Sequence, residues 1–387
     1  MLTFAFQMPE TDSPLWQGGV SLFENLIGAL KLTHAHDSAC WLAARQDAPA
    51  PAPALTAQTK GVIRYPNFTP RSRAWAIEYG KRVLLKSAMT ADRILRAQQV
   101  DVLFCNAPLR RTSLPSMALV PDLQHLRLPD FFSQADCAAR HAMFLRTIER
   151  ATRIIVISQA VRADVEQLAP TARDKIRVLP PEPVIPPEIY TTDPRYVLEK
   201  YHLPKKFFYL PNQLWRHKNH QLVLAALAQC KKQARNINVV CTGAIGDYRH
   251  AELASEILET VARLGLHAQF ILLGKIPRAD VFALHRQSIC VLNPSLFEGY
   301  GMSIAEARAI GKRVLASDLA AHRELDAPVA AYVDPHDADA LANALIEIWE
   351  TSAPGPALEL EQAARLAQAE RVRAVGHALY QAAAEIA

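Results

Sequence analysis

The feature that most constrains the fold is an alternation of strand-like and helical patterns along almost the whole chain. Apolar, strand-like runs occur in the first half at 2–6, 102–104, 117–121, 153–157 and 176–180, and in the second half at 207–211, 237–242, 268–273, 289–292, 314–316 and 331–333. Helical patterns separate these runs, for example at 21–31, 73–97, 135–150, 160–167, 221–233 and 251–264. Because strands that alternate with helices form parallel sheets covered on both faces, we predict an α/β protein.

A proline-rich segment divides the chain. Five prolines at 180, 181, 183, 186 and 187 follow the last strand-like run of the first half, and proline ends strands and fixes the direction of the chain. We therefore predict two doubly wound, Rossmann-like domains at 1–183 and 184–358, with a cleft between them, and a helical segment at 359–387. Ligands of such sheets bind beyond the carboxyl ends of the strands.

Composition narrows the class of protein. Half of the 387 residues are hydrophobic and 21% are charged, which is typical of a globular protein of two domains. No apolar run approaches the roughly 20 residues of a membrane span, and the first residues lack the basic start of a signal peptide. The six cysteines are scattered without a Cys-x-x-Cys pair, so we expect free thiols rather than disulfides or a zinc site. Together these features predict a cytoplasmic protein.

Positive charge is concentrated between residues 60 and 99. Nine basic residues lie there: Lys60, Arg64, Arg71, Arg73, Lys81, Arg82, Lys86, Arg93 and Arg96. Only Glu78 and Asp92 oppose them. The stretch is either a basic amphipathic helix that lies on anionic lipid at the inner face of the membrane, or a helix with one core face and one solvated face. No recognition motif accompanies the charge, so we expect no nucleic-acid partner.

The segment Pro-Ser-Leu-Phe-Glu-Gly-Tyr-Gly-Met-Ser-Ile-Ala-Glu at 294–306 places Glu298 and Glu306 eight positions apart. An apolar run precedes it and an alanine-rich run follows it, which indicates a strand, a tight loop and a helix. The loop consists of Gly299, Tyr300, Gly301, Met302 and Ser303. Its backbone N–H groups are free at a helix start, where phosphate binds. Since carboxylates accept hydrogen bonds from hydroxyls, a sugar joined to a nucleotide suits the segment. Two glutamates that only balance a helix dipole are the alternative.

This Glu-x7-Glu segment resembles the signature of retaining glycosyltransferases of the GT-B fold, of the family 4 (glycosyl transferases group 1) type found in bacterial polysaccharide and O-antigen assembly. The resemblance implies a GT-B fold with an acceptor-side domain at 1–183 and a nucleotide-sugar donor domain at 184–358. The helix at 359–387 would cross back to the first domain. It implies a GDP-, UDP- or dTDP-linked sugar as donor, a saccharide or lipid-linked glycan as acceptor, and no metal or other cofactor. Glu298 would hold the reacting sugar, and Glu306 would bind the ribose diol.

A second motif, Pro-Asn-Gln-Leu-Trp-Arg-His-Lys-Asn-His at 211–220, follows a strand and carries Arg216 and Lys218. Two cations at the carboxyl end of a strand can neutralise a diphosphate, although a surface loop with solvated bases would show the same residues. The motif resembles the Lys-Asn loop of the family, in which Lys218 matches the lysine that holds the donor diphosphate. Asn212 stands where the family often has arginine, so Arg216 is the candidate for that role. Both cations would then stabilise the leaving diphosphate in catalysis.

Two further turns follow strands of the second half. Gly243 lies in Thr-Gly-Ala-Ile-Gly-Asp at 242–247, and Lys275 and Ile276 follow Leu-Gly at 273–274. By themselves both segments are ordinary turns between a strand and a helix. The resemblance implies that the second turn contacts the nucleobase through its backbone and that Gly243 contributes to the donor site.

The first half carries two shorter motifs. Gly18 and Gly19 precede the helical pattern that starts at Ser21, and they resemble the family's glycine loop that faces the donor phosphates. The segment Val-Pro-Asp-Leu-Gln-His-Leu-Arg-Leu-Pro-Asp-Phe-Phe at 120–132 resembles the family's H-D-L-Q-H…P-E-F-F segment. Proline occupies the place of the first histidine, so that residue's sugar contact does not carry over. Asp122 and His125 remain candidates for sugar or acceptor contact, with a capped loop histidine as the alternative for His125.

Asp337-Ala-Asp339 has the D-x-D pattern of metal ligands, but it directly precedes an apolar helical run. Helix N-capping explains this better than a metal site. We therefore expect a metal-independent hexosyltransferase of the retaining type. The alternatives are a GT-B epimerase or phosphorylase, and a non-catalytic subunit that binds sugar nucleotides, which the changes at Pro121 and Asn212 keep open.

Overall fold

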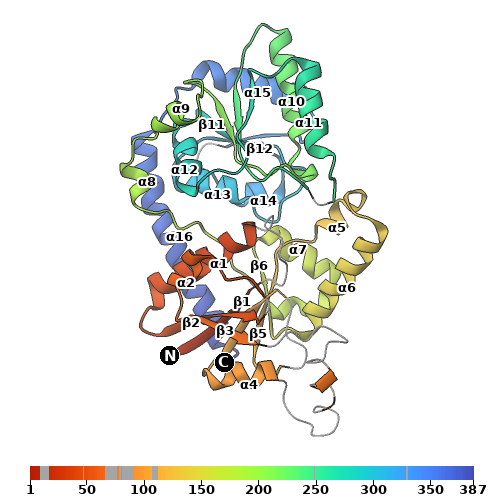
Figure 1. Ribbon diagram of the computed structural model, residues 1–387, viewed down its shortest axis with the longest axis vertical. Coiled ribbons are helices and arrows are strands. Elements are labelled where there is room, and N and C mark those ends of the chain that lie inside the picture. Colours follow the sequence, from red (N-terminus) through yellow and green to blue (C-terminus); the bar gives the residue numbers. More distant parts are fainter. Residues whose placement is uncertain are drawn as a thin grey trace. The chain divides into compact units, whose positions relative to one another are not determined.

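The computed structural model describes residues 1–8, 17–46, 48–65, 76–77, 80, 90–106, 112–247, 249–327 and 330–387. These residues form two compact units (Figure 1). The first comprises Met1–Leu123, Ala138–Val184 and Glu370–Ala387, and the second comprises Gln124–Cys137 and Ile185–Ala369. Each unit contains a parallel sheet of its own. The prediction of an α/β protein with two doubly wound sheets is therefore confirmed.

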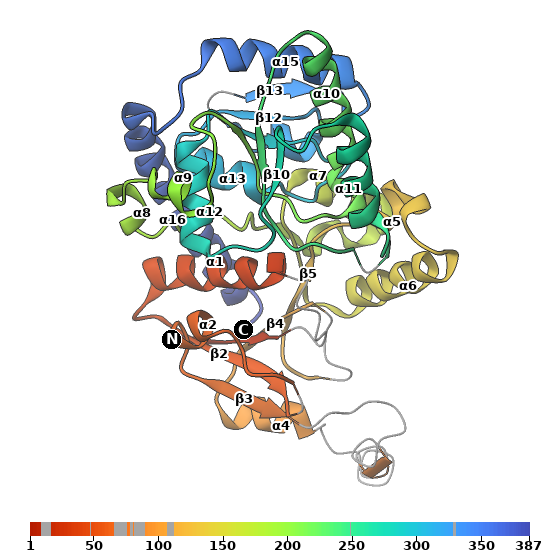
Figure 2. The same cartoon turned by 45° about the horizontal axis from the view of Figure 1, so that its top comes forward.

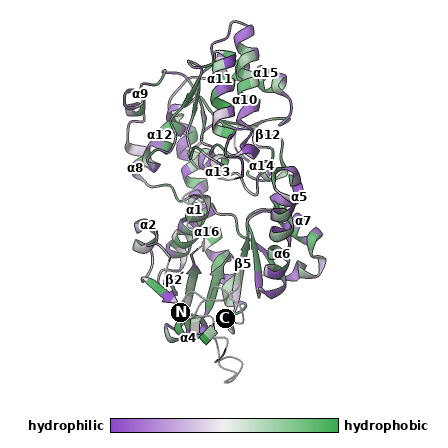
Figure 3. Cartoon of the chain, turned by 45° about the vertical axis from the view of Figure 1, so that its right-hand side comes forward, coloured by the Kyte–Doolittle hydropathy of each residue, from purple (hydrophilic) through white to green (hydrophobic). Residues whose placement is uncertain are grey.

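In the first unit, the described strands form a seven-stranded sheet in the order β3-β2-β1-β4-β5-β6-β7. The strands are β1 (Leu2–Gln7), β2 (Ser38–Arg45), β3 (Val62–Tyr65), β4 (Val102–Cys105), β5 (Ser116–Val120), β6 (Arg153–Val156) and β7 (Ile176–Val178). The helices are α1 (Gln17–His34), α2 (Pro53–Ala57), α4 (Thr90–Ala97), most of α6 (Gln134–Arg150), α7 (Gln159–Leu168), the short η2 (Pro170–Lys175) and the C-terminal part of α16 (Leu358–Ala384). The central strands are coloured mainly as hydrophobic in Figure 3, which fits strands buried on both faces.

In the second unit, the described strands form a six-stranded sheet in the order β10-β9-β8-β11-β12-β13. The strands are β8 (Phe208–Leu210), β9 (Val239–Cys241), β10 (Phe270–Leu272), β11 (Cys290–Asn293), β12 (Val314–Ser317) and β13 (Ala330–Val333). The helices are α5 (Gln124–Arg127), η1 (Pro129–Phe131), α8 (Glu188–Thr191), α9 (Tyr196–Lys200), η3 (Arg216–Lys218), α10 (His220–Lys232), α11 (Leu253–Leu264), α12 (Arg278–Gln287), α13 (Met302–Ala309), α14 (Ala320–Arg323) and α15 (Ala338–Thr351).

The second sheet is covered on both faces. Successive residues of a strand point to opposite faces, and β8 shows this directly. Phe208 and Leu210 pack in one apolar cluster with residues of α10, α11 and α15. Phe207 and Tyr209 pack in another cluster with residues of α9 and α12. Figure 2 shows α11 and α12 on opposite sides of this sheet. The loops considered below leave this sheet at its carboxyl edge, and Leu214 of the loop after β8 also packs in the first cluster.

Some sequence predictions need correction. The strands β2 and β3 were not predicted. Helix α1 begins at Gln17 rather than Ser21, so Gly18 and Gly19 lie in the first turn of a helix and not in a loop before it. Because glycine is a poor helix former, the sequence pattern predicts the start of this helix after Gly18 and Gly19. Of the helix predicted at 73–97, the structure describes α4 at Thr90–Ala97 and helical residues at 76–77 and 80, and the other residues of this range lie outside the described ones.

The cysteines are in the state that the sequence predicts. All six cysteines are free thiols, and all except Cys137 are buried, as predicted. Among the described residues, no helix combines the length and the apolar character that crossing a membrane requires.

Gly243 allows two loops at the carboxyl edge of the second sheet to approach closely. Its φ of +138° is rare for a residue with a side chain, and an added Cβ would lie 2.7 Å from Gln213 Cα. Gly246 has a similar φ of +140° but open space around its Cα. Both Gly→Ala substitutions meet backbone strain of about 1–3 kcal/mol, and only Gly243→Ala adds overlap with the 211–219 loop.

We predict that Gly243→Ala destabilises the protein by about 1–3 kcal/mol more than Gly246→Ala does. Denaturant unfolding of the two variants measures this difference. Equal losses of stability in the two variants would show that the approach of Gly243 to Gln213 is not tight.

Candidate functional site

Four loops of the second unit leave the sheet at the same edge. In the order β10-β9-β8-β11, each strand is hydrogen-bonded to the next and all run parallel, so their carboxyl ends are neighbours. The loop after β8 carries Lys218, the turn after β9 carries Gly243, the turn after β10 carries Lys275, and the loop after β11 carries Glu298. The topology therefore brings these four predicted positions to one edge of the sheet.

Lys218 and Glu298 form an ion pair. Lys218 Nζ donates to Glu298 Oε1 over 2.6 Å, and the two side chains are 18% and 11% exposed. Ser295 Oγ donates to the same oxygen over 2.8 Å, and Asn293 Nδ2 does so over 3.4 Å. Burial alone would raise the pKa of Glu298, but the charge and hydrogen bond of the Lys218 ammonium are the main causes that outweigh it and lower the pKa to about 2. Glu298 is therefore a carboxylate at neutral pH.

The second oxygen of Glu298 is available to a ligand. Every hydrogen bond that the structure describes at this carboxylate reaches Oε1, and none reaches Oε2. A carboxylate oxygen accepts two hydrogen bonds. Lys218 also keeps two further N–H bonds beside the one that it gives to Glu298. The pair thus presents an anionic acceptor and a cationic donor at one point of the sheet edge.

Glu306 lies in α13 and is 4% exposed. Its Oε1 accepts from Arg278 Nη2, at the start of α12, and its Oε2 lies 3.5 Å from His285 Nε2. Burial opposes the charged form of Glu306, but Arg278 and His285 outweigh this effect and lower its pKa to about 2. Burial lowers the pKa of His285 itself. Sequence reasoning missed Arg278 and His285, because only the fold brings α12 beside α13.

The loop between the two glutamates is held by specific contacts. Gly301 caps α13 with φ +98°, and an added Cβ would lie 3.2 Å from His322 Cδ2. His322 is fully buried, and its Nδ1 lies 2.8 Å from Ser317 O. The Ser303 hydroxyl accepts from Asn293 Nδ2 over 3.0 Å. Met302 and Ser303 are the first residues of α13, so the N–H groups of this turn have no intrahelical partner.

Arg216 has a different environment from Lys218, although both lie in η3. Its guanidinium lies 4.4 Å from the centre of the Phe131 ring, and its backbone N–H donates to Asp247 Oδ2 over 3.2 Å. Sequence reasoning also missed Arg249. This residue pairs with the buried Asp247, lies over the rings of Trp215 and Phe132, and donates to Gln124 Oε1 over 2.9 Å.

The other predicted residues have the following places, each within its own unit. Lys275 is exposed and Ile276 is partly buried, in the turn after β10. Asp122 belongs to the first unit and pairs with Arg140 over 3.6 Å. His125 belongs to the second unit and is 2% exposed within α5. Gly18 and Gly19 belong to the first unit.

The acidic D-x-D string is a helix cap. Asp337 Oδ1 accepts from the backbone N–H groups of Asp339 and Ala340 at the start of α15, which confirms the N-capping interpretation. Within the described ranges, no group of histidine, cysteine, aspartate and glutamate side chains has the arrangement of a metal site.

The basic stretch at 60–99 lies partly outside the described residues. Its members Arg71, Arg73, Lys81, Arg82 and Lys86 are not among them. Of the others, Arg64 donates to the carbonyls of Arg45 and Ala48, and Arg96 donates to Ser113 Oγ. Lys60 and Arg93 are exposed.

We predict that Glu298→Gln weakens stability by about 3 kcal/mol at pH 7, because it leaves the Lys218 ammonium partly buried without its counter-charge. The folded pKa of Glu298, about 2, lies below the roughly 4.3 of an unfolded glutamate. The Lys218–Glu298 pair therefore contributes fully to the free energy of unfolding above about pH 4.3, and this contribution is lost as the pH falls towards 2. Denaturant unfolding at several pH values from 7 to 3 measures the difference in stability between wild type and Glu298→Gln. Substitution of the exposed Glu259 by Gln is the control. A stability difference between wild type and Glu298→Gln that does not shrink below pH 4 contradicts the ion pair.

Known proteins resemble this chain in fold and in part of its sequence. Residues 198–372 match the family model described as Glycosyl transferases group 1, whereas curated protein sequences give no match. A glycosyltransferase from Rickettsia africae ESF-5 has a similar structure, with a TM-score of 0.70 and 17% identity over 100% of this chain and 98% of that chain. Anabaena HepE, solved with UDP and glucose, has a TM-score of 0.69 and 17% identity over 100% of both chains.

WaaG, a glycosyltransferase involved in lipopolysaccharide biosynthesis, has a TM-score of 0.60 and 17% identity over 100% of this chain and 99% of that chain. At such identities the likeness of the structures establishes the fold. The chain therefore has the GT-B glycosyltransferase fold, and the part of it that carries Lys218, Glu298 and Glu306 matches the model of the glycosyl transferases group 1 family.

Proposed function

We propose that this protein is a retaining glycosyltransferase that moves a hexose from a UDP-sugar to a saccharide or lipid-linked glycan. The Lys218–Glu298 pair is the observation that carries the proposal, because it offers a cation for a diphosphate and a free carboxylate oxygen for a sugar hydroxyl side by side. The match of residues 198–372 to glycosyl transferases group 1 supports the reaction class. HepE, solved with UDP-glucose, favours UDP among the GDP-, UDP- and dTDP-linked donors.

Lys218 binds the diphosphate of the donor in this proposal. Its ammonium keeps two N–H groups for phosphate oxygens while it remains paired with Glu298. The N-terminus of α13, at Gly301–Ser303, adds the positive end of the helix dipole. These groups stabilise the charge that develops on the leaving nucleoside diphosphate. Arg216 stays a predicted contributor to the same charge, although the contacts described for its side chain are with Phe131.

The transfer itself follows a front-face course. The bond between the anomeric carbon and the phosphate oxygen breaks, and the acceptor oxygen bonds to the same face of the sugar. The departing phosphate oxygen takes the proton of the acceptor hydroxyl, so that charge and atoms balance. Glu298 Oε2 holds a sugar hydroxyl and stabilises the cationic sugar ring as it forms. Lys218 supplies the positive charge, so we propose a reaction that needs no metal ion.

Glu306 anchors the ribose diol of the donor in this proposal. Both of its oxygens are engaged by Arg278 and His285, so a bound ribose replaces part of the Arg278 contact. Arg278 is half-exposed and can move into solvent without unfolding α12. The turn with Lys275 and Ile276 contacts the nucleobase through its backbone, and Gly243 lines the donor site beside it.

The first half of the chain supplies further contacts. Gly18 and Gly19 bind donor phosphates through the first turn of α1, and Asp122 and His125 contact the sugar or the acceptor. Because WaaG acts in lipopolysaccharide biosynthesis, we propose family 4 chemistry in polysaccharide or O-antigen assembly. In this proposal the sugar transfer takes place in the cytoplasm, at the inner face of the membrane, where the basic 60–99 stretch contacts anionic lipid.

Two other functions remain distinct alternatives. A non-catalytic subunit would bind the sugar nucleotide and release no product, and Pro121 and Asn212 at two family positions favour it most. A GT-B epimerase or phosphorylase would change the donor without an acceptor. Thermal-shift comparison of UDP-, GDP- and dTDP-sugars, followed by analysis of the products, separates these cases, because a ligand that binds only the folded state raises the melting temperature.

We predict different kinetic effects for the three side chains. Lys218→Ala and Glu298→Ala lower the rate of UDP release from the donor by about 10²–10³-fold, because each removes stabilisation of transition-state charge. Glu306→Gln raises the dissociation constant for UDP about tenfold, because it removes a charged acceptor for the ribose, and it changes kcat much less. Initial rates and isothermal titration with UDP measure both effects.

The matched control is Glu259→Gln, an exposed glutamate on α11, which leaves both quantities unchanged. Tight donor binding without any release of UDP or sugar product in wild type would falsify the transferase proposal. An inverted anomeric configuration of the product, read by NMR coupling, would reject the retaining course alone.

A further inference from the structure

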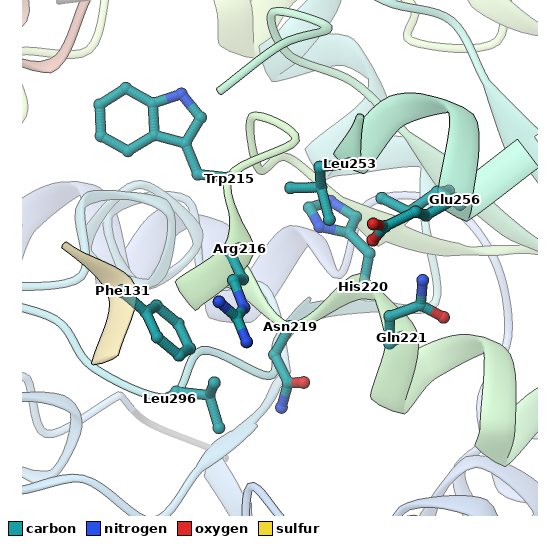
Figure 4. Close-up of a pocket in the computed structure, with 10 residues that line it drawn as sticks. Phe131, Trp215, Arg216, Asn219, His220, Gln221, Leu253, Glu256 and Leu296 are labelled. Carbon is teal, nitrogen blue, oxygen red and sulfur yellow. The ribbon is translucent and has the colours of Figure 1, made fainter. Parts of the chain in front are cut away.

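A cavity lies in the second unit, beside the loop that carries Lys218. It has a volume of about 260 Å³ and is lined by ten residues: Phe131, Trp215, Arg216, Asn219, His220, Gln221, Leu253, Glu256, Ile257 and Leu296 (Figure 4). They come from η1, the 211–219 loop, the starts of α10 and α11, and the loop after β11. Neither Lys218 nor Glu298 is among them, so this cavity is distinct from the ion pair.

The polar lining of the cavity is suited to hydroxyl groups. In Figure 4, Arg216 and Phe131 lie on one side, Gln221 and Glu256 lie on the other, and Asn219 and His220 lie between them. Gln221 and Glu256 are exposed, and their side chains form no hydrogen bond or ion pair within the described residues. Asn219 uses its amide N–H groups on the carbonyls of Pro294 and Pro335, which leaves its oxygen as an acceptor. The cavity therefore offers both donors and acceptors, on guanidinium, amide and carboxylate groups.

The balance of charge selects an uncharged ligand. Arg216 and Glu256 contribute one positive and one negative group, and burial lowers the pKa of His220 to about 4, so this histidine is neutral at physiological pH. An anion would meet the carboxylate of Glu256, and a cation would meet Arg216. A polyol can instead accept from one group and donate to the other.

The apolar lining and the size point the same way. The buried side chains of Leu253 and Ile257 and the aromatic rings of Phe131 and Trp215 also line the cavity. One face of a ligand would therefore pack against apolar side chains. Pockets for drug-sized ligands measure about 300–1,000 Å³, and this cavity is slightly smaller. One sugar ring, with apolar C–H faces and hydroxyls at its edge, has the matching size and chemistry.

The cavity is coupled to the ion pair through two short segments. Arg216 in its wall is two residues from Lys218, and Leu296 is two residues from Glu298. The backbone N–H of Leu296 donates to His217 O over 2.8 Å, which joins the two walls. Phe131 is fixed by the Arg216 guanidinium and by an edge contact with His250. A ligand in the cavity is thereby held at a set position relative to Lys218 and Glu298.

From these observations we propose that the cavity is a subsite for one neutral sugar ring of the acceptor saccharide. Gln221 and Glu256 are its specificity-determining side chains. The assignment as an acceptor subsite rests on the proposed transferase function, but the binding of a sugar ring to the cavity does not.

Saturation-transfer NMR on the full chain tests the subsite, with methyl hexopyranosides as probes and saturating UDP present. We expect a transfer signal from at least one methyl hexoside with wild type. Glu256→Gln weakens the binding of this probe by about tenfold, as the loss of a hydrogen bond to a charged group does. Gln221→Ala removes a hydrogen bond between neutral groups and weakens binding by about threefold, and the double variant weakens it by more than either single one. Glu259→Gln, one turn further along α11, is the matched control and leaves the signal unchanged.

UDP titration of the same variants keeps the two proposals apart. Unchanged UDP affinity together with weaker hexoside binding supports the subsite. Normal UDP binding without a signal from any methyl hexoside overturns it, and so does a signal that the Glu256 and Gln221 variants leave intact. Failure of wild type to bind UDP or any other nucleoside diphosphate contradicts the proposed function instead. Displacement of the hexoside by inorganic pyrophosphate would assign the cavity to an anion and also overturn the subsite.

Discussion

The ion pair between Lys218 and Glu298 is the interaction on which the candidate site depends. A partly buried carboxylate normally resists ionisation, and this one stays charged because an ammonium lies 2.6 Å away. Each charge alone would lose hydration without a partner to compensate for it, which costs several kcal/mol. Together they keep a cation and an anion in place before any ligand arrives, and such preorganised charge is what stabilises a transition state with separated charges.

The backbone makes this pair possible. Parallel strands β8 and β11 are neighbours in the sheet, so the loops that follow them begin side by side. Asn293, at the end of β11, then donates to Glu298 and to Ser303 and fixes the following loop on both sides of its turn. Gly243 lets the turn after β9 approach the Lys218 loop within distances that a Cβ would forbid. The chemistry of the site thus follows from sheet order and from a few positions where only small or polar side chains fit.

Sequence reasoning predicted the fold class and the two motifs at the carboxyl edge of the second sheet, because strand periodicity and motif spacing are local properties. It missed β2, whose sequence Ser-Ala-Cys-Trp-Leu-Ala-Ala-Arg contains no β-branched residue and three alanines, which strands disfavour. It missed Arg278, His285 and Arg249 for another reason. Their roles arise from contacts between elements distant in the chain, such as the contact of Arg278 with Glu306, and no spacing of residues in the sequence predicts such contacts.

The central claim is that Lys218 binds the diphosphate of a nucleotide donor while Glu298 remains free for the sugar. Isothermal titration of UDP and of uridine with wild type and Lys218→Met measures the diphosphate contribution directly. The account predicts that UDP binds wild type much more tightly than uridine does, and that this advantage falls by at least about tenfold in Lys218→Met while uridine binding is unchanged. An advantage of UDP over uridine that survives in Lys218→Met would contradict the account.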